Sequence, residues 1–160
     1  MNILITHSTE KKLCGKTIQT TIAAQETSKL WRPFREAIKK KLDLAPNLFY
    51  SISRYGVELA KGEFTIDGEF EKCAAIEASL SNCPTGFEEV ILDGGLYAVF
   101  LHRGAADGFP ATMQEFLQHW LPKSDYILDS RNHFETFDQR YDPFSSRSVE
   151  TIYIPLKEAK

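Results

Sequence analysis

Apolar residues recur at helical spacing in two parts of this chain. From Glu26 to Leu42 they alternate with Lys and Arg every three to four positions, which predicts an amphipathic helix. A second helix is predicted from Pro110 to Leu121, because Pro110 suits a first helical turn and Pro122 ends the pattern. The apolar stripes consist of Leu30, Trp31, Phe34, Ile38 and Leu42 in the first helix and Met113, Phe116, Leu117 and Trp120 in the second.

Runs of β-branched and aromatic residues surround both helices and are separated by turn signals, a pattern typical of strands. The predicted strands are Leu13–Ile22, Leu48–Tyr55, Phe70–Ala78, Leu96–His102, Phe134–Asp138 and Val149–Pro155. The order strand, helix, strand, strand therefore occurs twice. We interpret the chain as one α+β domain, residues 1–160, with repeat halves of about 11–80 and 90–157. Two βαββ units related by a pseudo-twofold axis are expected to form a curved antiparallel sheet carrying two main helices.

The two halves also resemble each other in residue pattern. Asn47–Tyr50 resembles Asn132–Glu135, an alignment that makes Tyr50 the symmetry mate of Glu135. Two such units, each laying a helix on the sheet, are expected to leave a groove along the axis. One half then supplies an aromatic wall where the other half supplies a charge.

Charge and composition exclude several classes of protein. The formal net charge of -3 and the pI near 5.8 argue against a broad nucleic-acid-binding surface, which requires clustered Lys and Arg. The nearest basic cluster, Lys39–Lys41, is interpreted as the end of a helix. No apolar run approaches the roughly 20 residues of a membrane span, and the N-terminus lacks a signal-peptide pattern.

The cysteines and histidines show no spacing that indicates a disulfide framework or a metal site. Three cysteines are present, Cys14, Cys73 and Cys83, and no two of them form a C-x-x-C motif. We therefore expect a reduced, cytoplasmic protein without a metal or another cofactor. Nucleophile motifs such as G-x-S-x-G are also absent from the sequence.

A single carboxylate, Glu135, lies within an aromatic-rich strand. A charge in an apolar setting costs several kcal/mol unless it is paired, protonated or bound to a ligand. Alternate side chains of a strand share a face, so His133, Glu135 and Phe137 are expected to point the same way. An ordinary ion pair is the alternative, and its candidate partners are Arg54, Arg103 and Arg140.

Aromatic residues elsewhere are the candidates for the walls of a ligand pocket. Tyrosine suits a wet cavity because its ring is apolar and its hydroxyl forms hydrogen bonds. Trp31 has the spacing of a core residue but can also form the floor of the groove. The predicted ligand-binding residues are Glu135, Tyr153, Tyr97, Tyr50, Phe137 and Trp31.

Several segments of the chain together resemble a known family, the GyrI-like small-molecule-binding domains, which also form the effector-binding part of AraC-type and multidrug-responsive regulators. The segments are Leu30–Phe34, Pro84–Gly104, Trp120–Tyr126, Phe134–Phe137 and Glu150–Pro155. The resemblance implies the SHS2/GyrI-like fold and an aromatic pocket in which Glu135 receives lipophilic cations. The domain fills the chain, leaving no room for a helix-turn-helix segment, so direct DNA binding is not implied. Phe137 stands where the family often has tyrosine.

Three functions follow from the resemblance. The first is a stand-alone effector-binding protein that senses or sequesters lipophilic, cationic small molecules. The second is a hydrolase of electrophilic, cyclopropane-bearing toxins, because stand-alone members of the family are associated with that reaction. Glu135 would then be the general base or acid. The third is a gyrase-inhibitor-like module that binds a protein partner, for which no local sequence feature marks an interface.

Overall fold

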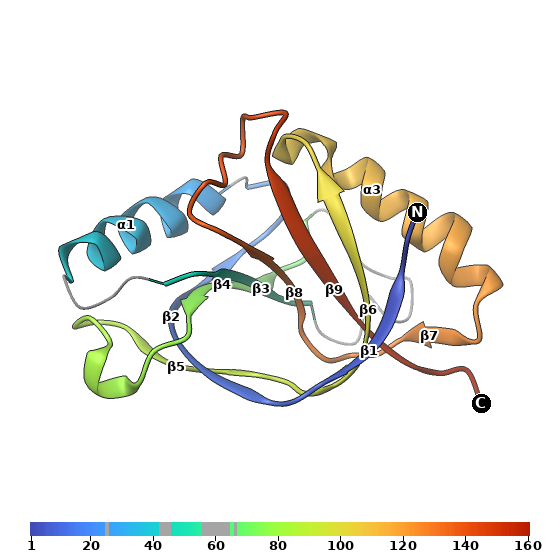
Figure 1. The fold of residues 1–160 in the computed structure, drawn as a ribbon, viewed down its shortest axis with the longest axis horizontal. Helices are drawn as coiled ribbons and strands as arrows, with labels where there is room; N and C mark the ends of the chain where they lie inside the picture. Colours follow the sequence, from blue (N-terminus) through green and yellow to red (C-terminus); the bar gives the residue numbers. More distant parts are fainter. Residues whose placement is uncertain (25, 42–45, 56–64, 66) are drawn as a thin grey trace.

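The computed structural model describes residues 1–24, 26–41, 46–55, 65 and 67–160 (Figure 1). The strands of this part are β1 Leu4–Ser8, β2 Lys11–Thr20, β3 Phe49–Arg54, β4 Phe70–Ile76, β5 Glu88–Leu92, β6 Gly95–Arg103, β7 Tyr126–Leu128, β8 His133–Phe137 and β9 Val149–Glu158. The two main helices are α1 Thr27–Lys40 and α3 Phe109–Glu115. A π-helical segment, Phe116–Trp120, continues α3.

The described strands form one antiparallel sheet of nine strands. Its order is β1-β6-β9-β8-β3-β4-β2-β5, with β7 beside β9. The sheet contains two corresponding units, β2-α1-β3-β4 and β6-α3-β8-β9. The strand order β6-β9-β8 of one unit continues as β3-β4-β2 of the other, which is the equivalent order reversed, so the two units meet at the β3–β8 pair. This arrangement confirms the predicted α+β fold and its tandem βαββ repeat.

All of the predicted strands and both predicted helices are present, with ends that differ by a few residues. The predicted end of the first helix, Leu42, lies outside the described residues. Strands β1, β5 and β7 were not predicted from the sequence. Four of the five β1 residues are exposed, and β5 begins with two exposed glutamates and buries only Val90 and Leu92, so neither strand has the longer buried apolar run by which the others were recognised.

Both main helices lie on the same side of the sheet, here called the helix-covered face (Figure 1). The apolar stripe of α1 is buried against β2, β3 and β4 through Leu30, Phe34 and Ile38. On α3 and its π-helical continuation, Phe116 is buried and its ring stacks on Phe100 of β6 at 4.9 Å. Burial of these stripes is the main force that holds each helix on the sheet.

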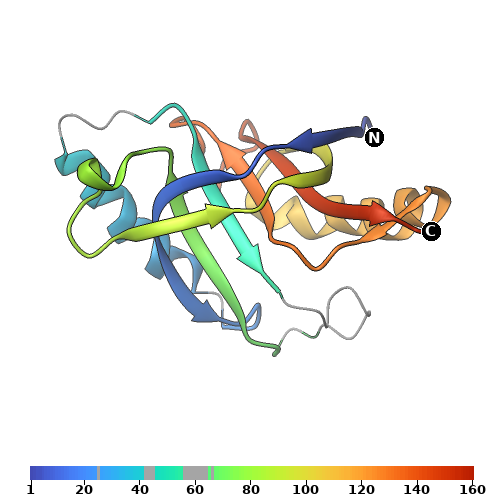
Figure 2. The ribbon, with the colours of Figure 1, turned by 90° about the horizontal axis from the view of Figure 1, so that it is seen from below.

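The opposite side, here called the strand-covered face, is buried by the sheet itself. Strands β1 and β2 are nearly continuous, as are β5 and β6, and these two long ribbons cross in front of β3 and β4 (Figure 2). The strong curvature encloses a second apolar core. Its buried members are Leu13, Tyr50, Ile52, Cys73, Ala75, Val90, Leu92, Tyr97 and Phe134.

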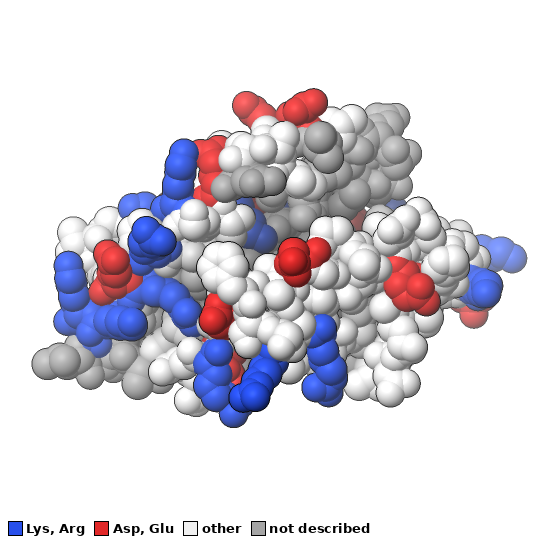
Figure 3. Space-filling model, turned by 90° about the horizontal axis from the view of Figure 1, so that it is seen from above, with Lys and Arg blue, Asp and Glu red and all other residues white. Residues whose placement is uncertain are grey.

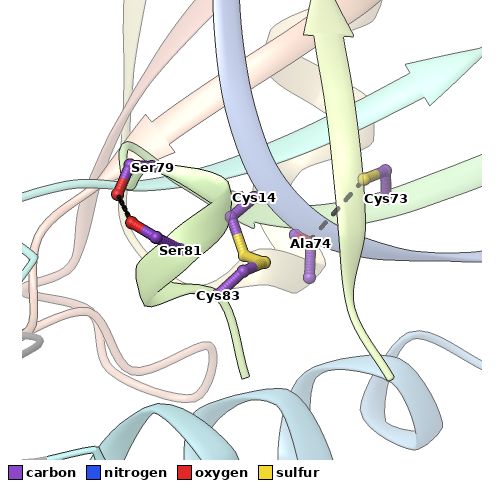
Figure 4. Close-up of a disulfide and its surroundings, with 6 residues drawn as sticks. All are labelled: Cys14, Cys73, Ala74, Ser79, Ser81 and Cys83. Atoms are coloured by element: carbon purple, nitrogen blue, oxygen red, sulfur yellow. Dashed lines mark hydrogen bonds between the residues drawn. A yellow bond between two sulfur atoms is a disulfide. The ribbon is translucent and has the colours of Figure 1, made fainter. Parts of the chain in front are cut away.

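A disulfide joins Cys14 of β2 to Cys83, whose Cα atoms lie 5.9 Å apart (Figure 4). Both residues belong to the apolar cluster beneath α1, whereas Cys73 points away from them into the other core. The expectation that the cysteines form no disulfide is therefore wrong for this pair. The disulfide could not be predicted from the sequence, because 69 positions separate the two residues and only the fold brings them together.

None of the helices in the described part of the chain is long and apolar enough to cross a membrane.

Candidate functional site

Glu135 lies at the centre of β8, on the helix-covered face. Its neighbours across the strands are Ser51 of β3 and Ile152 of β9. Tyr50 lies opposite Thr136 and thus on the other face. A twofold axis perpendicular to the sheet superposes the two units without exchanging the faces of the sheet. Symmetry mates must therefore lie on the same face, so the alignment of Tyr50 with Glu135 is wrong.

The Glu135 carboxylate has no hydrogen bond or salt bridge to any residue that the structure describes. Burial raises its pKa to about 7, and the neighbouring charge of Glu150 acts in the same direction, while Lys72 partly opposes both. Two of the arginines considered as partners have acids of their own: Arg54 lies near Glu71 and Arg140 near Asp138. Glu135 is therefore a deeply placed carboxylate that still keeps part of its surface accessible.

Aromatic rings from three elements gather beside this carboxylate. Phe137 follows on the same face of β8, and its ring centroid lies 5.1 Å from that of Trp31 on α1. The ring centroid of Phe49 on β3 lies 5.9 Å from that of Phe137, and the centroid of Tyr141 lies 4.3 Å from it. We call Glu135, Trp31, Phe49, Phe137 and Tyr141 the Glu135 cluster.

Further charged groups border the cluster. The Tyr141 hydroxyl donates a hydrogen bond of 3.3 Å to Oε2 of Glu150, a carboxylate whose own pKa is raised by burial. The Arg35 guanidinium lies 4.7 Å from the centre of the Phe49 ring, a cation-π arrangement. Neither Glu150 nor Arg35 was predicted as a site residue. The alternation of β9 could have suggested Glu150, because it shares a face with Ile152.

His133 shares the face of Glu135, as its position in the strand predicted. It is buried and packs edge-on against the ring of Tyr55 at 5.1 Å. Burial lowers its pKa to about 4, so the imidazole is neutral at physiological pH. It therefore adds no positive charge to balance Glu135.

The three predicted tyrosines lie together on the strand-covered face. Tyr97 is fully buried, and its hydroxyl donates to the backbone oxygen of Asp93 at 2.5 Å. Tyr153 stacks on Phe134 with centroids 4.2 Å apart, and Tyr50 lies 6.1 Å from the same ring. The structure thus brings Glu135, Phe137 and Trp31 together and separates them from the tyrosines, while the ligand-binding roles of all six residues stay predictions.

Charged side chains are dispersed over the helix-covered face. Lys and Arg gather at the α1 end and along the lower edge of the view, and acidic groups are scattered among them and toward the α3 end (Figure 3). The last turn of α1 contains Lys39 and Lys40, as the sequence predicted. Within the described residues, no group of three or more His, Cys, Asp or Glu side chains is placed to hold a metal ion.

Residues 1–157 match a known protein family, described as the GyrI-like small molecule binding domain. This chain belongs to that family. The match spans essentially the whole sequence, in agreement with the resemblance seen in its motifs. Among curated proteins, none matches the sequence of this GyrI-like domain.

Solved structures share the fold of this GyrI-like domain at low sequence identity. SAV2435, solved bound to tetraphenylphosphonium, is 20% identical with a TM-score of 0.64, over 98% of this chain and 94% of that one. The C-terminal domain of EcmrR is 15% identical with a TM-score of 0.67, over 99% and 98%. A hydrolase encoded by lin2189 from Listeria innocua is 11% identical with a TM-score of 0.63, over 97% and 91%.

The geometry of this GyrI-like domain limits what its carboxylate can do. Because the pKa of Glu135 is about 7, protonated and ionised forms coexist near neutral pH. The ionised form has no cation bonded to it among the described residues, so a ligand cation can supply the missing charge. The same balance suits a group that accepts a proton from water.

Proposed function

We propose that this GyrI-like domain binds lipophilic cations at the Glu135 cluster. The observation that carries the proposal is a deeply placed carboxylate that has no bonded partner among the described residues and stands beside aromatic rings of α1, β3 and β8. A buried charge without a partner is costly, and proteins keep such groups mainly where they serve a ligand or a reaction. A role in sensing or sequestering such compounds follows from this binding.

The aromatic rings and the carboxylate would act on different parts of the ligand. Each well-placed ring contributes roughly 0.5–2 kcal/mol of cation-π attraction. Trp31 and Phe137 would contact the flat apolar groups of the ligand. Their ring centroids are only 5.1 Å apart, so one flat group could touch both rings. Glu135 would meet the charge in a region where water screens it less than at the surface. The solved complex of SAV2435 with tetraphenylphosphonium, a lipophilic cation, supports this choice of ligand class.

Calorimetric titration with tetraphenylphosphonium and with neutral triphenylphosphine oxide tests the proposal. We expect the cation to bind more tightly, and Glu135→Gln to weaken it by at least about 30-fold, because loss of one partner of a buried charge pair costs about 2 kcal/mol or more. Glu77→Gln, which changes an exposed carboxylate on the other face, is the matched control. Equal binding of both compounds, unchanged in Glu135→Gln, would contradict the proposal.

Hydrolysis is a second candidate, favoured by the pKa of about 7 that burial gives Glu135. As a general base, Glu135 would take a proton from water while the water oxygen bonds to an electrophilic cyclopropane carbon. The ring carbon that leaves would receive a proton, so one water molecule is added across the broken bond. Mass spectrometry of a cyclopropane-bearing electrophile incubated with the protein measures this addition. Turnover that persists in Glu135→Gln would exclude Glu135 as the base.

A further inference from the structure

A separate cavity lies on the strand-covered face, on the far side of the sheet from Glu135. Its volume is about 250 Å³, and its walls come from β3, β8 and β9 together with the β1–β2 connection and the end of β5. Pockets for drug-sized ligands measure roughly 300–1,000 Å³, so this cavity suits a smaller molecule with a single ring.

Two stacked rings provide the apolar wall of the cavity. Phe134 and Tyr153 lie 4.2 Å apart with their planes only 8° from parallel. Tyr50 lies beside Phe134 and lines the same space. This arrangement offers a flat aromatic surface to a ligand ring.

A carboxylate stands at the exposed edge of the cavity. Oε1 of Glu77 accepts a hydrogen bond of 2.6 Å from the Tyr50 hydroxyl, which keeps the pKa of Glu77 below its ordinary value. The Lys11 ammonium lies 3.4 Å from the same oxygen. Both charged side chains are largely exposed, and ion pairs of this kind contribute only about 0–1 kcal/mol. A ligand cation can therefore replace Lys11 at little cost.

Two hydroxyl groups that β8 and β9 contribute to the lining have no hydrogen-bond partner among the described residues. Thr136 is only 7% exposed, and Tyr153 is partly exposed. Buried polar groups in native proteins are normally hydrogen-bonded to protein or to water. Because no fully inaccessible polar side-chain atom of the described residues lacks a partner, the Thr136 hydroxyl must reach the open space of the cavity.

We infer that this cavity is a second ligand site, which takes a small, single-ring aromatic amine in its protonated form. The ring lies against Phe134 and Tyr153, the ammonium group meets Glu77, and the Thr136 hydroxyl accepts or donates one further hydrogen bond. A second acid, Asp93, also lines the cavity, so its lining has two acidic residues and one lysine. The site is independent of Glu135, because the sheet separates the two.

Two-dimensional amide NMR with 2-phenylethylammonium and neutral 2-phenylethanol tests this inference. The amine should shift the amides of Glu77, Thr136 and Tyr153 and bind about tenfold more tightly than the alcohol, as expected for a hydrogen bond to a charged group. Glu77→Gln should remove that advantage without affecting the alcohol. Because Glu77 is exposed, this variant should fold normally.

Glu135→Gln is the matched control and should leave the affinity for the amine unchanged. Equal affinity for the two compounds in the wild type would overturn the inference. The absence of saturable shifts would do so too, as would shifts that gather around Trp31 and Phe137 and disappear in Glu135→Gln. The last result would support the Glu135 cluster while removing the second site, so the two proposals can fail separately.

Discussion

The two faces of the sheet each place one carboxylate beside aromatic rings, yet the two carboxylates differ in charge state. On the helix-covered face, burial raises the pKa of Glu135 to about 7. On the strand-covered face, the hydrogen bond from Tyr50 lowers the pKa of Glu77. Residue type is therefore a poor guide to charge. Depth and hydrogen bonding determine whether a glutamate is a fixed anion or a group that exchanges its proton near neutral pH.

The faces also differ in how they are closed. The helix-covered face depends on segments that dock onto the sheet, namely α1 and the residues around Tyr141. The strand-covered face is closed by ribbons that belong to the sheet and share its backbone hydrogen bonds. A ligand can displace a docked segment at lower cost than a paired strand, which favours the helix-covered face for large lipophilic cations.

Loss of the disulfide is expected to have the largest effect and to fall mainly on the helix-covered face. Cys83→Ala should lower the free energy of unfolding by about 2–4 kcal/mol, because the Cys14–Cys83 bond restricts the unfolded chain. Urea denaturation measures the loss, and hydrogen exchange should show that α1 loses more protection than β6. A reducing agent should not destabilise Cys83→Ala further. Equal loss of protection on both faces would contradict the expectation that the disulfide mainly stabilises the helix-covered face.

Titration of Glu135 should make stability depend on pH. Its pKa rises on folding from an ordinary 4.5 to about 7, so the folded state binds more protons in this range and stability falls as pH increases. His133 acts in the opposite direction, because its pKa falls on folding from 6.5 to about 4. The wild-type profile should therefore be flatter than either contribution alone.

Comparison with Glu135→Gln isolates the contribution of Glu135 to the pH dependence of stability. The stability of this variant relative to the wild type should increase by up to about 3 kcal/mol between pH 4.5 and pH 7. Urea denaturation at several pH values measures the difference. A difference that does not change with pH would mean that the carboxylate titrates normally, and Glu77→Gln should show no comparable increase in this range.

Removal of one aromatic wall should have an intermediate effect on binding. Trp31→Ala should weaken tetraphenylphosphonium by roughly 3- to 30-fold, the equivalent of one cation-π contact. Trp120→Ala is the matched control, because Trp120 packs on Phe116 beneath the other helix. If calorimetry gives the same loss for both variants, the effect is one of stability and Trp31 is not part of the site.

The smallest effect is expected for Tyr153→Phe. Tyr153 lies on the strand-covered face, so tetraphenylphosphonium affinity should stay within about twofold of the wild type, as is usual for a change remote from a site. A large loss would mean that the two faces are coupled or that the cation binds on the strand-covered face.

The periodicity of hydrophobic and polar positions, together with the composition, was sufficient to predict much of the fold. Alternation within β8 correctly placed His133, Glu135 and Phe137 on one face, since side chains of a strand alternate whatever its partners are. Helical spacing likewise identified the buried stripe of α1. The repeated order of elements predicted the tandem units. Each of these features is local, so neighbouring residues carry the information.

Tertiary structure alone decided how these local features meet. The register between β3 and β8 sets Ser51, not Tyr50, opposite Glu135, and a slip of one residue would exchange the faces. The register between β8 and β9 likewise places Tyr153 beside Phe134, on the face that Glu135 does not share. Such pairings depend on the packing of distant segments, and so does the Cys14–Cys83 bond. The sequence thus determined which residues of one strand share a face, while long-range packing decided which strands bring them together.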